Sequence, residues 1–149
     1  MKYKKSHMDQ KVRPYVTKAI SDGCNILEID VQQAQGRIVL GHNWRPKLVC
    51  LFDCTLDDYL KLVPAGTIIQ LDIKEICFTS WGQRRFAGLI AKAFEPYKGK
   101  FEITLSANSG FFRWETMEIV YMFLYLSIQM PRLWHTWKVG KEIETVDYW

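Results

Sequence analysis

Two short segments of this chain are apolar enough to be core β-strands and yet carry acidic side chains in their middle. Residues 26–31 read ILEIDV and residues 68–74 read IIQLDIK, so that Glu28, Asp30 and Asp72 alternate with large aliphatic residues. Side chains alternate between the two faces of a strand, which places Glu28 and Asp30 on one face. A carboxylate on a core strand is costly without a partner. The fold must therefore supply a partner, which we infer to be a divalent cation.

A lysine and a histidine accompany the three carboxylates. Lys74 follows Asp72 at the spacing that puts both on one face, and His42 ends the apolar residues 38–42. Carboxylate oxygens are the ligands of Mg²⁺, or alternatively of Ca²⁺. A lysine supplies positive charge to a phosphoryl oxygen, and a histidine moves a proton to or from an ester oxygen near neutral pH. The set predicts phosphate-ester chemistry at a metal site.

The segment before His42 decides whether this histidine joins the carboxylates. Residues 32–37, QQAQGR, are polar with one glycine and predict a hairpin turn between two short strands. A three-residue loop centred on Gly36 places His42 opposite Asp30, whereas a two-residue loop places it on the other face. The sequence leaves this register open, and the three-residue loop is the one that builds a site.

These residues and their order resemble the phosphatidylinositol-phospholipase-C-like (PLC-like) phosphodiesterases, which include the glycerophosphodiester phosphodiesterases and the sphingomyelinase D/phospholipase D toxins. In that family a histidine ends the first strand, and a helix and a strand with Glu-x-Asp follow. A second histidine comes next, and then a strand with an acidic residue and a lysine two positions on. The matching residues here are His7, Glu28, Asp30, His42, Asp72 and Lys74. Two features look more like the toxin branch. The third acidic residue is Asp72 and not a glutamate, and His7 is followed by Met8, whereas the glycerophosphodiesterases have His-Arg-Gly.

The resemblance implies a fold, a cofactor and a reaction. The fold is expected to be an α/β barrel of the TIM type, shortened because 149 residues are too few for a full barrel. Mg²⁺ would bind Glu28, Asp30 and Asp72, His7 and His42 would be the general acid and base, and Lys74 would hold the phosphate. The substrate would be a glycerophosphodiester or a phospholipid headgroup. Hydrolysis by water and attack by the substrate's own hydroxyl, which leaves a cyclic phosphate, both stay open.

Alternating strand and helix patterns predict a parallel α/β core and a single domain over residues 1–149, short at its C-terminal end relative to a full barrel. Strands are expected at residues 3–7, 26–31, 37–41, 67–73, 101–106 and 132–138. Helices are expected at residues 12–21, 56–63, 83–94 and 117–130. The second of these helices opens on Thr55, which with Asp58 resembles a capping box.

Residues 117–130 are strongly apolar but fall below the roughly 20 residues that a membrane span needs. A buried helix is the first interpretation. The alternatives are a helix that binds a second copy of the chain, or a contact with a membrane surface that a lipid substrate would make natural. The aromatic residues suited to either interface are Trp114, Trp134, Trp137 and Trp149.

Composition sets further expectations. The chain is 48% hydrophobic and 24% charged, as in a globular domain, and carries a net charge of +4. Its one basic cluster, Lys2, Lys4 and Lys5, comes with no nucleic-acid-binding motif, so nucleic acid is not an expected partner. No signal peptide pattern follows Met1, which makes a cytoplasmic location the default expectation.

Four cysteines are present, and their spacing is not that of a zinc motif. Free thiols are the default expectation. By the resemblance, however, Cys50 and Cys54 lie in the loop where the toxin branch carries a disulfide. An oxidised pair at these positions would imply an extracellular or oxidising compartment.

A noncatalytic relative is the rival interpretation. Glu28 and Asp30 on an ordinary antiparallel sheet would be a solvated face, and Lys74 could simply pair with Asp72 or Glu75. A shortened barrel could keep its metal ligands for stability or ligand capture. It could equally act as a binding module through its aromatic C-terminal part.

Overall fold

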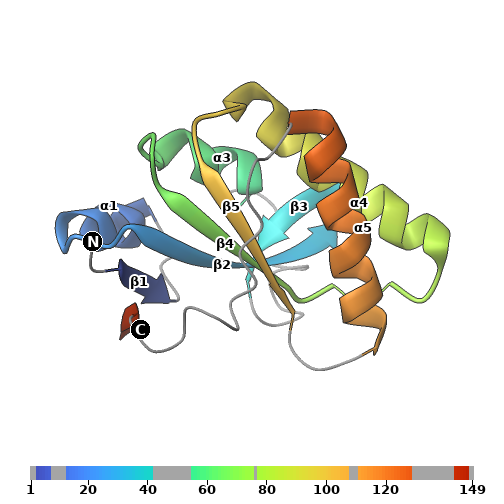
Figure 1. Ribbon diagram of the computed structural model, residues 1–149, viewed down its shortest axis with the longest axis horizontal. Coiled ribbons are helices and arrows are strands. Elements are labelled where there is room, and N and C mark those ends of the chain that lie inside the picture. Colours follow the sequence, from blue (N-terminus) through green and yellow to red (C-terminus); the bar gives the residue numbers. More distant parts are fainter. Residues whose placement is uncertain are drawn as a thin grey trace.

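The computed structural model describes residues 3–7, 13–41, 55–75, 77–107, 111–128 and 143–147, which form six strands and four α-helices (Figure 1). The strands are β1 (Tyr3–His7), β2 (Ile26–Ala34), β3 (Arg37–Leu40), β4 (Ile68–Ile73), β5 (Glu102–Ala107) and β6 (Ile143–Asp147). The helices are α1 (Arg13–Ser21), α3 (Leu56–Leu62), α4 (Ser80–Phe94) and α5 (Phe111–Ile128), with a short 3₁₀ helix η2 (Glu95–Tyr97) after α4.

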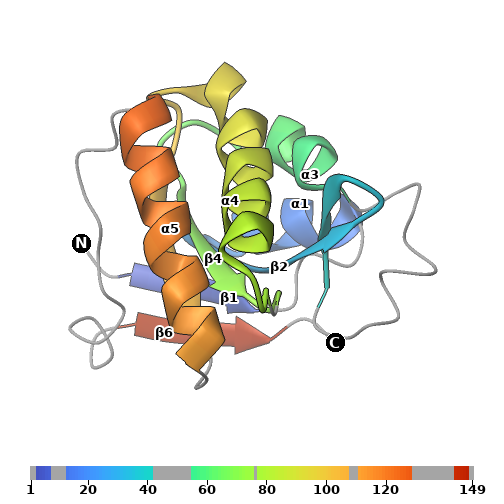
Figure 2. The ribbon, with the colours of Figure 1, turned by 90° about the vertical axis from the view of Figure 1, so that its right-hand side faces the viewer.

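The described strands form one sheet in the order β5-β4-β2-β1-β6, and β3 pairs with β2 at its side. All neighbours along this path are parallel, whereas β3 runs antiparallel to β2. From β1 to β5 each parallel strand lies beside its predecessor, and the helices between them lie on one face of the sheet (Figures 1 and 2). The α/β class with a largely parallel sheet, predicted from the alternating pattern, is confirmed.

Strand β6 pairs with β1 over five residues, from Tyr3–Ile143 to His7–Asp147. The pairing brings the last described strand beside the first, at the side of β1 that faces away from β2 (Figure 2). The sequence patterns missed β6 and indicated residues 132–138, which lie outside the described residues. Among the described strands β5 and β6 are not paired, so closure into a TIM-type barrel stays a prediction.

Side-chain caps explain where two helices begin. The hydroxyl of Thr55 accepts a hydrogen bond from Asp58 N at 3.2 Å, as the predicted capping box requires. Helix α4 begins at Ser80, three residues earlier than predicted, because Thr79 caps it and accepts from Gly82 N at 3.1 Å. Helix α5 also begins before its predicted start, at Phe111.

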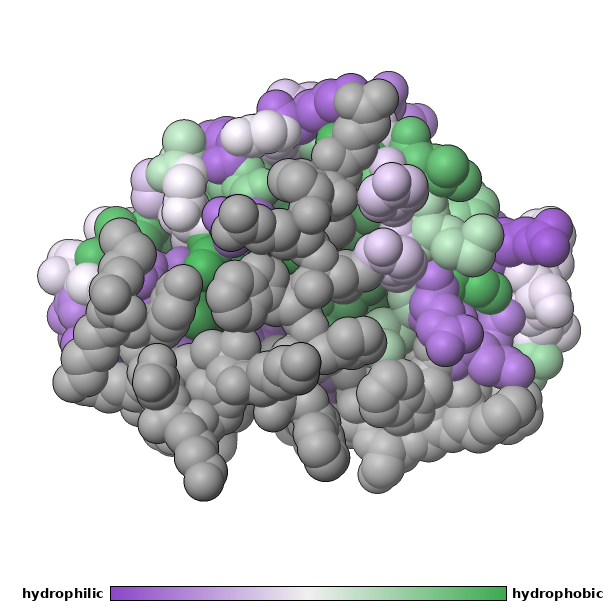
Figure 3. All heavy atoms as spheres, viewed as in Figure 1, coloured by the Kyte–Doolittle hydropathy of each residue, from purple (hydrophilic) through white to green (hydrophobic). Residues whose placement is uncertain are grey.

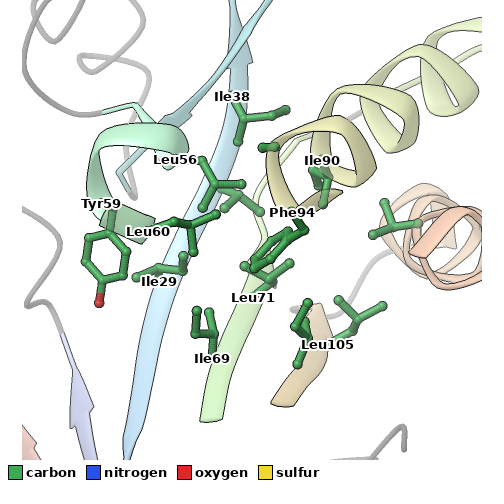
Figure 4. Packing of buried hydrophobic residues seen from close by; sticks show 14 of the residues in the cluster. Ile29, Ile38, Leu56, Tyr59, Leu60, Ile69, Leu71, Ile90, Phe94 and Leu105 are labelled. Carbon is green, nitrogen blue, oxygen red and sulfur yellow. The ribbon is translucent and has the colours of Figure 1, made fainter. Parts of the chain in front are cut away.

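One face of the sheet forms the hydrophobic core with the helices. Its aliphatic positions are the odd-numbered ones, including Leu27, Ile29, Val31, Ile69, Leu71, Ile73, Ile103 and Leu105. They pack on buried residues of all four helices, among them Ala19, Leu60, Phe86, Phe94 and Leu124. Figure 4 shows Leu60 of α3 and Phe94 of α4 beside Ile69 and Leu71 of β4. Because side chains alternate along a strand, the even-numbered positions of β2, β4 and β5 lie on the opposite face.

Helix α5 is buried on one side only. Val120 and Leu124 are fully buried against the core, and the ring of Phe123 approaches Gly88 of α4. Tyr125 and Leu126 are exposed on the other side. The predicted buried helix is thus buried on one side and exposes apolar residues on the other. No helix in the described ranges is long and apolar enough to cross a membrane.

Two phenylalanines test this division between core and surface. Phe86 is fully buried, whereas Phe78 is 74% exposed. We expect Phe86→Ala to lower the free energy of unfolding by about 3–5 kcal/mol, because it removes apolar contacts and leaves a cavity. The matched Phe78→Ala should change it by less than about 0.5 kcal/mol. Urea unfolding of both variants measures the difference, and equal losses would contradict the packing described.

Candidate functional site

The face of the sheet opposite the helices carries polar residues in register across three neighbouring strands. The row nearer the carboxyl ends contains Asp30, Asp72 and Ser106, and the row one step before it contains Glu28, Gln70 and Thr104. The three carboxylates are buried, with 9%, 2% and 6% of Glu28, Asp30 and Asp72 exposed. Parallel register therefore brings together the acidic residues that the sequence placed on separate strands.

Two lysines neutralise these carboxylates. Lys74 Nζ lies 2.6 Å from Asp72 Oδ2 and 3.3 Å from Asp30 Oδ1, and its side chain is 6% exposed. Lys5 Nζ, from β1, lies 2.5 Å from Glu28 Oε2 in an ion pair that lacks hydrogen-bond geometry. In the described structure the partners of the acidic residues are thus lysines, as the rival interpretation of Lys74 anticipated.

One carboxylate oxygen is left over among the described side chains. Three carboxylates there lie against two lysines, and Asp72 Oδ1 has no hydrogen-bond partner among the described residues. Burial raises the pKa of Asp72, and Asp30 and Glu28 raise it further by repulsion, while the hydrogen bond and charge of Lys74 lower it. The ionised carboxylate of Asp72 is therefore held in a place that disfavours it.

The hairpin between β2 and β3 has a two-residue turn, Gln35–Gly36, with φ angles of 48° and 74°. Val31 pairs with Leu40, and Gly41 N donates to Asp30 O at 2.9 Å. Of the two loop lengths that the sequence left open, the structure has the two-residue one, and not the three-residue one that would place His42 opposite Asp30. A turn with two positive φ angles matches the twist of the flanking strands, and glycine at its second position makes it accessible.

His42 itself lies outside the described residues, and so its place in the site stays a prediction. Strand alternation ends just before it, because Gly41 has a φ of 148°, a conformation open mainly to glycine. The side-chain amide of Gln32 donates to Gly41 O. Gln32 thus holds Gly41, the residue next to His42. The sequence signal that points to Gln32 is its position two residues after Asp30, which places it on the same face of β2 as Glu28 and Asp30.

The ends of β2 and β4 are also tied together. Lys74 N donates to Val31 O at 3.1 Å, and Gln33 N donates to a carboxylate oxygen of Glu75 at 2.6 Å. These bonds fix the backbone on both sides of the Lys74 side chain. Glu75, considered above as a partner for Lys74, therefore has a different role.

The backbone of His7 is described, although its side chain is not. Ser6 pairs with Leu27, so that His7 comes level with Glu28 in the register of β1 and β2. On its other side His7 pairs with Asp147 of β6. Strand order thus places this predicted catalytic residue next to the strand that carries two of the acidic residues.

The donor set suits a hard divalent cation, because it consists of carboxylate oxygens with one oxygen of Asp72 unused. A ready-made cluster of three His, Cys, Asp or Glu side chains in metal-binding arrangement is absent from the described residues. Instead, Lys74 lies within 3.3 Å of both Asp30 and Asp72. The types of these residues suit Mg²⁺ or Ca²⁺, whereas their arrangement in the described structure places a lysine between Asp30 and Asp72.

Further predictions fall partly or wholly outside the described side chains. Cys24 and Cys77 are buried and are not part of a disulfide, but Cys50 and Cys54 are not described. The same holds for the side chains of the aromatic residues proposed for a C-terminal interface, Trp114, Trp134, Trp137 and Trp149. The disulfide and that interface stay predictions.

Comparisons with protein-family models, curated proteins and solved structures find no match to this chain. The resemblance to the PLC-like phosphodiesterases therefore depends on the residues and their order in the sequence.

The role of Lys74 as shared counter-ion gives a stability prediction. Lys74→Met keeps most of the apolar stem but leaves Asp30 and Asp72 buried without their positive partner. We expect the free energy of unfolding to fall by about 3–5 kcal/mol in urea at neutral pH with EDTA. Lys92→Met, on the exposed side of α4, is the matched control and should cost less than about 0.5 kcal/mol. A loss no larger than the control's would argue against the charge pairing.

The raised pKa of Asp72 gives a pH prediction. A carboxyl group whose pKa is higher in the folded protein than its ordinary value of 3.8 stabilises the fold below that value and loses this contribution as the pH rises. In metal-free buffer, the stability of Asp72→Asn relative to the natural protein should therefore increase as the pH is raised from about 3 to about 7. Thermal melts across this range measure it, with the exposed Asp57→Asn as control. A pH-independent difference would refute the assignment of charge strain to Asp72.

Proposed function

We propose that this protein is a Mg²⁺-dependent phosphodiesterase that cleaves a glycerophosphodiester or a phospholipid headgroup. The observation that carries the proposal is the gathering of Glu28, Asp30, Asp72 and Lys74 on one buried face of neighbouring parallel strands. Asp72 and Lys74 lie at the carboxyl end of β4, where parallel α/β folds place their catalytic groups. Carboxylates with a lysine are the set that a metal and a phosphate need.

Glu28, Asp30 and Asp72 would hold the cation, with Ca²⁺ as the alternative to Mg²⁺. When bound, the cation would supply positive charge to a non-bridging phosphate oxygen and stabilise the charge that develops there. It would also reduce the repulsion among the three carboxylates. The carboxylates would then need less neutralisation from the lysines, which leaves the charge of Lys74 for the phosphate.

His7 and His42 would transfer the protons on the attacking and leaving sides of the phosphorus. The register of β1 brings the His7 backbone level with Glu28, and Gln32 holds the carbonyl of Gly41 beside His42. The register of β1 supports the assignment of His7. The assignment of His42 depends on the order of residues in the sequence, because the two-residue turn does not pair it with Asp30. Either water or a hydroxyl of the substrate could be the nucleophile.

The strand order supports a shortened barrel of the TIM type. In such a barrel consecutive parallel strands are neighbours and the last strand returns to the first. Strands β1, β2, β4 and β5 follow one another in this manner, and β6 pairs with β1. We propose that the described sheet is the part of such a barrel that carries the catalytic residues.

One observation favours a second candidate, a noncatalytic relative that binds ligands or partners. Lys5 and Lys74 already lie against the acidic residues, so the polar face can form without a cation. In that case the carboxylates and lysines would form a structural charge network.

³¹P NMR tests the proposed activity. The full chain is incubated with Mg²⁺ and a mixture of lysophospholipid, sphingomyelin and glycerophosphocholine, and an EDTA sample serves as the blank. We expect a new metal-dependent phosphorus signal whose shift shows whether the product is cyclic. His42→Ala should lower the rate by about 10²- to 10⁴-fold, because it removes a proton-transfer group. Glu28→Gln should abolish the metal-dependent signal, while the exposed Glu95→Gln should keep full activity.

Thermal melting separates the two candidates. Mg²⁺ that binds the folded state raises the melting temperature by mass action whether or not turnover occurs. A rise that Glu28→Gln removes, together with unchanged ³¹P spectra, would favour the noncatalytic relative. Full activity of Glu28→Gln or His42→Ala would refute the catalytic assignment.

A further inference from the structure

Two large aromatic side chains project into solvent where α4 begins. Phe78 is 74% exposed and Trp81 is 69% exposed, and they flank Thr79, the N-cap of the helix. Exposed aromatic residues in a group mark interaction surfaces, and tryptophan is the residue favoured at the boundary between water and lipid.

The aromatic pair lies close to the proposed site along the chain. The segment that carries Phe78 and Trp81 leaves the carboxyl end of β4 directly after Lys74 and Glu75. Its backbone is held in place, because Gly82 N donates to Thr79 Oγ1 and the amide of Gln83 contacts the carbonyl of Cys77. The aromatic rings therefore project from a supported turn at the catalytic edge of the sheet.

Positive charge accompanies the aromatic pair. Arg84 and Arg85 are exposed one turn after Trp81, and the Arg85 guanidinium lies 5.3 Å from the centre of the Trp81 ring. The Arg85 side chain also extends to the tip of the β2–β3 hairpin. Its Nη2 atom lies 3.9 Å from the position that a Cβ atom would take on Gly36. Exposed Arg37 follows in that hairpin. On the α4–α5 side of the molecule, hydrophobic and strongly hydrophilic residues share one surface (Figure 3).

We infer that the turn between β4 and α4 anchors the protein on an anionic lipid surface. Phe78 and Trp81 would insert among the headgroups, and Arg84 and Arg85 would bind the negative charge of the lipids. The inference rests on the proposed function for its last step, in which the anchor presents the site to phosphodiesters of the membrane itself. The binding surface alone does not require that step.

The other exposed apolar group fits such a surface less well. It consists of Met122, Tyr125 and Leu126 on α5. The charged residues among the described side chains of α5 are acidic, Glu115 and Glu118, and would be repelled by anionic headgroups. This group therefore offers a control surface of similar hydrophobicity.

Vesicle sedimentation tests the anchor with the full chain. The vesicles contain phosphatidylcholine with about one-quarter phosphatidylserine, and pure phosphatidylcholine vesicles serve for comparison. We expect the natural protein to sediment with the anionic vesicles. Both the double variant Phe78→Ser/Trp81→Ser and the double variant Arg84→Glu/Arg85→Glu should bind them at least about tenfold more weakly. Leu126→Ser on α5 and Lys98→Glu at the opposite edge of the sheet should bind as the natural protein does.

Several outcomes would overturn the inference. They are no sedimentation of the natural protein with anionic vesicles, unchanged binding of either double variant, and loss of binding in Leu126→Ser. Circular dichroism melts of each variant exclude unfolding as the cause of a loss. Exposed positions 78 and 81 make such unfolding unexpected.

Turnover distinguishes this inference from the proposed function. If Phe78→Ser/Trp81→Ser keeps its activity on soluble glycerophosphocholine and loses activity on vesicle sphingomyelin, both stand. Vesicle binding without any turnover would leave the anchor in place and refute the phosphodiesterase. If Phe78→Ser/Trp81→Ser turns over both substrates as fast as the natural protein does, the anchor is refuted and the phosphodiesterase stands.

Discussion

The cost of burying Glu28, Asp30 and Asp72 on one face of a parallel sheet shapes the rest of this structure. The opposite face is apolar and is covered by helices, as in any α/β domain. The polar face needs compensation, because an isolated carboxylate loses its hydration there. Lys74 and Lys5 supply compensation, and the raised pKa of Asp72 shows that its ionised form is still disfavoured.

The disfavoured charge of Asp72 links the stability of the fold to the proposed chemistry. A core selected for stability alone would favour apolar residues at these positions, since a buried ion pair seldom gains more than its desolvation costs. Functional sites commonly retain such strained charge. In the proposed function a cation would relieve the repulsion among the carboxylates, and Lys74, which neutralises Asp30 and Asp72, would bind the phosphate. The same groups would then serve the folded state and the bound state.

Strand β4 connects the inner site with the outer surface. It carries Asp72, and Lys74 follows directly after its last residue. The chain then continues to Phe78, just before α4, and to Trp81 in the first turn of α4. Hydrogen bonds from the backbone of β2 hold the start of this segment, and the cap at Thr79 holds its end. A lipid contact at the turn would therefore lie on the same edge of the sheet as the proposed site.

The sequence by itself determined the local elements and the faces of the strands. Periodicity placed the helices, the capping box located the start of α3, and the spacing of Glu28 and Asp30 put both on one face. Register and pairing between distant segments were decided by the tertiary structure. The turn at Gly36 has two residues and not three, β6 pairs with β1, and Lys5 of β1 neutralises Glu28 of β2. Such features depend on which distant segments pair in the folded chain. The residues of a single segment do not specify its pairing partner or the register.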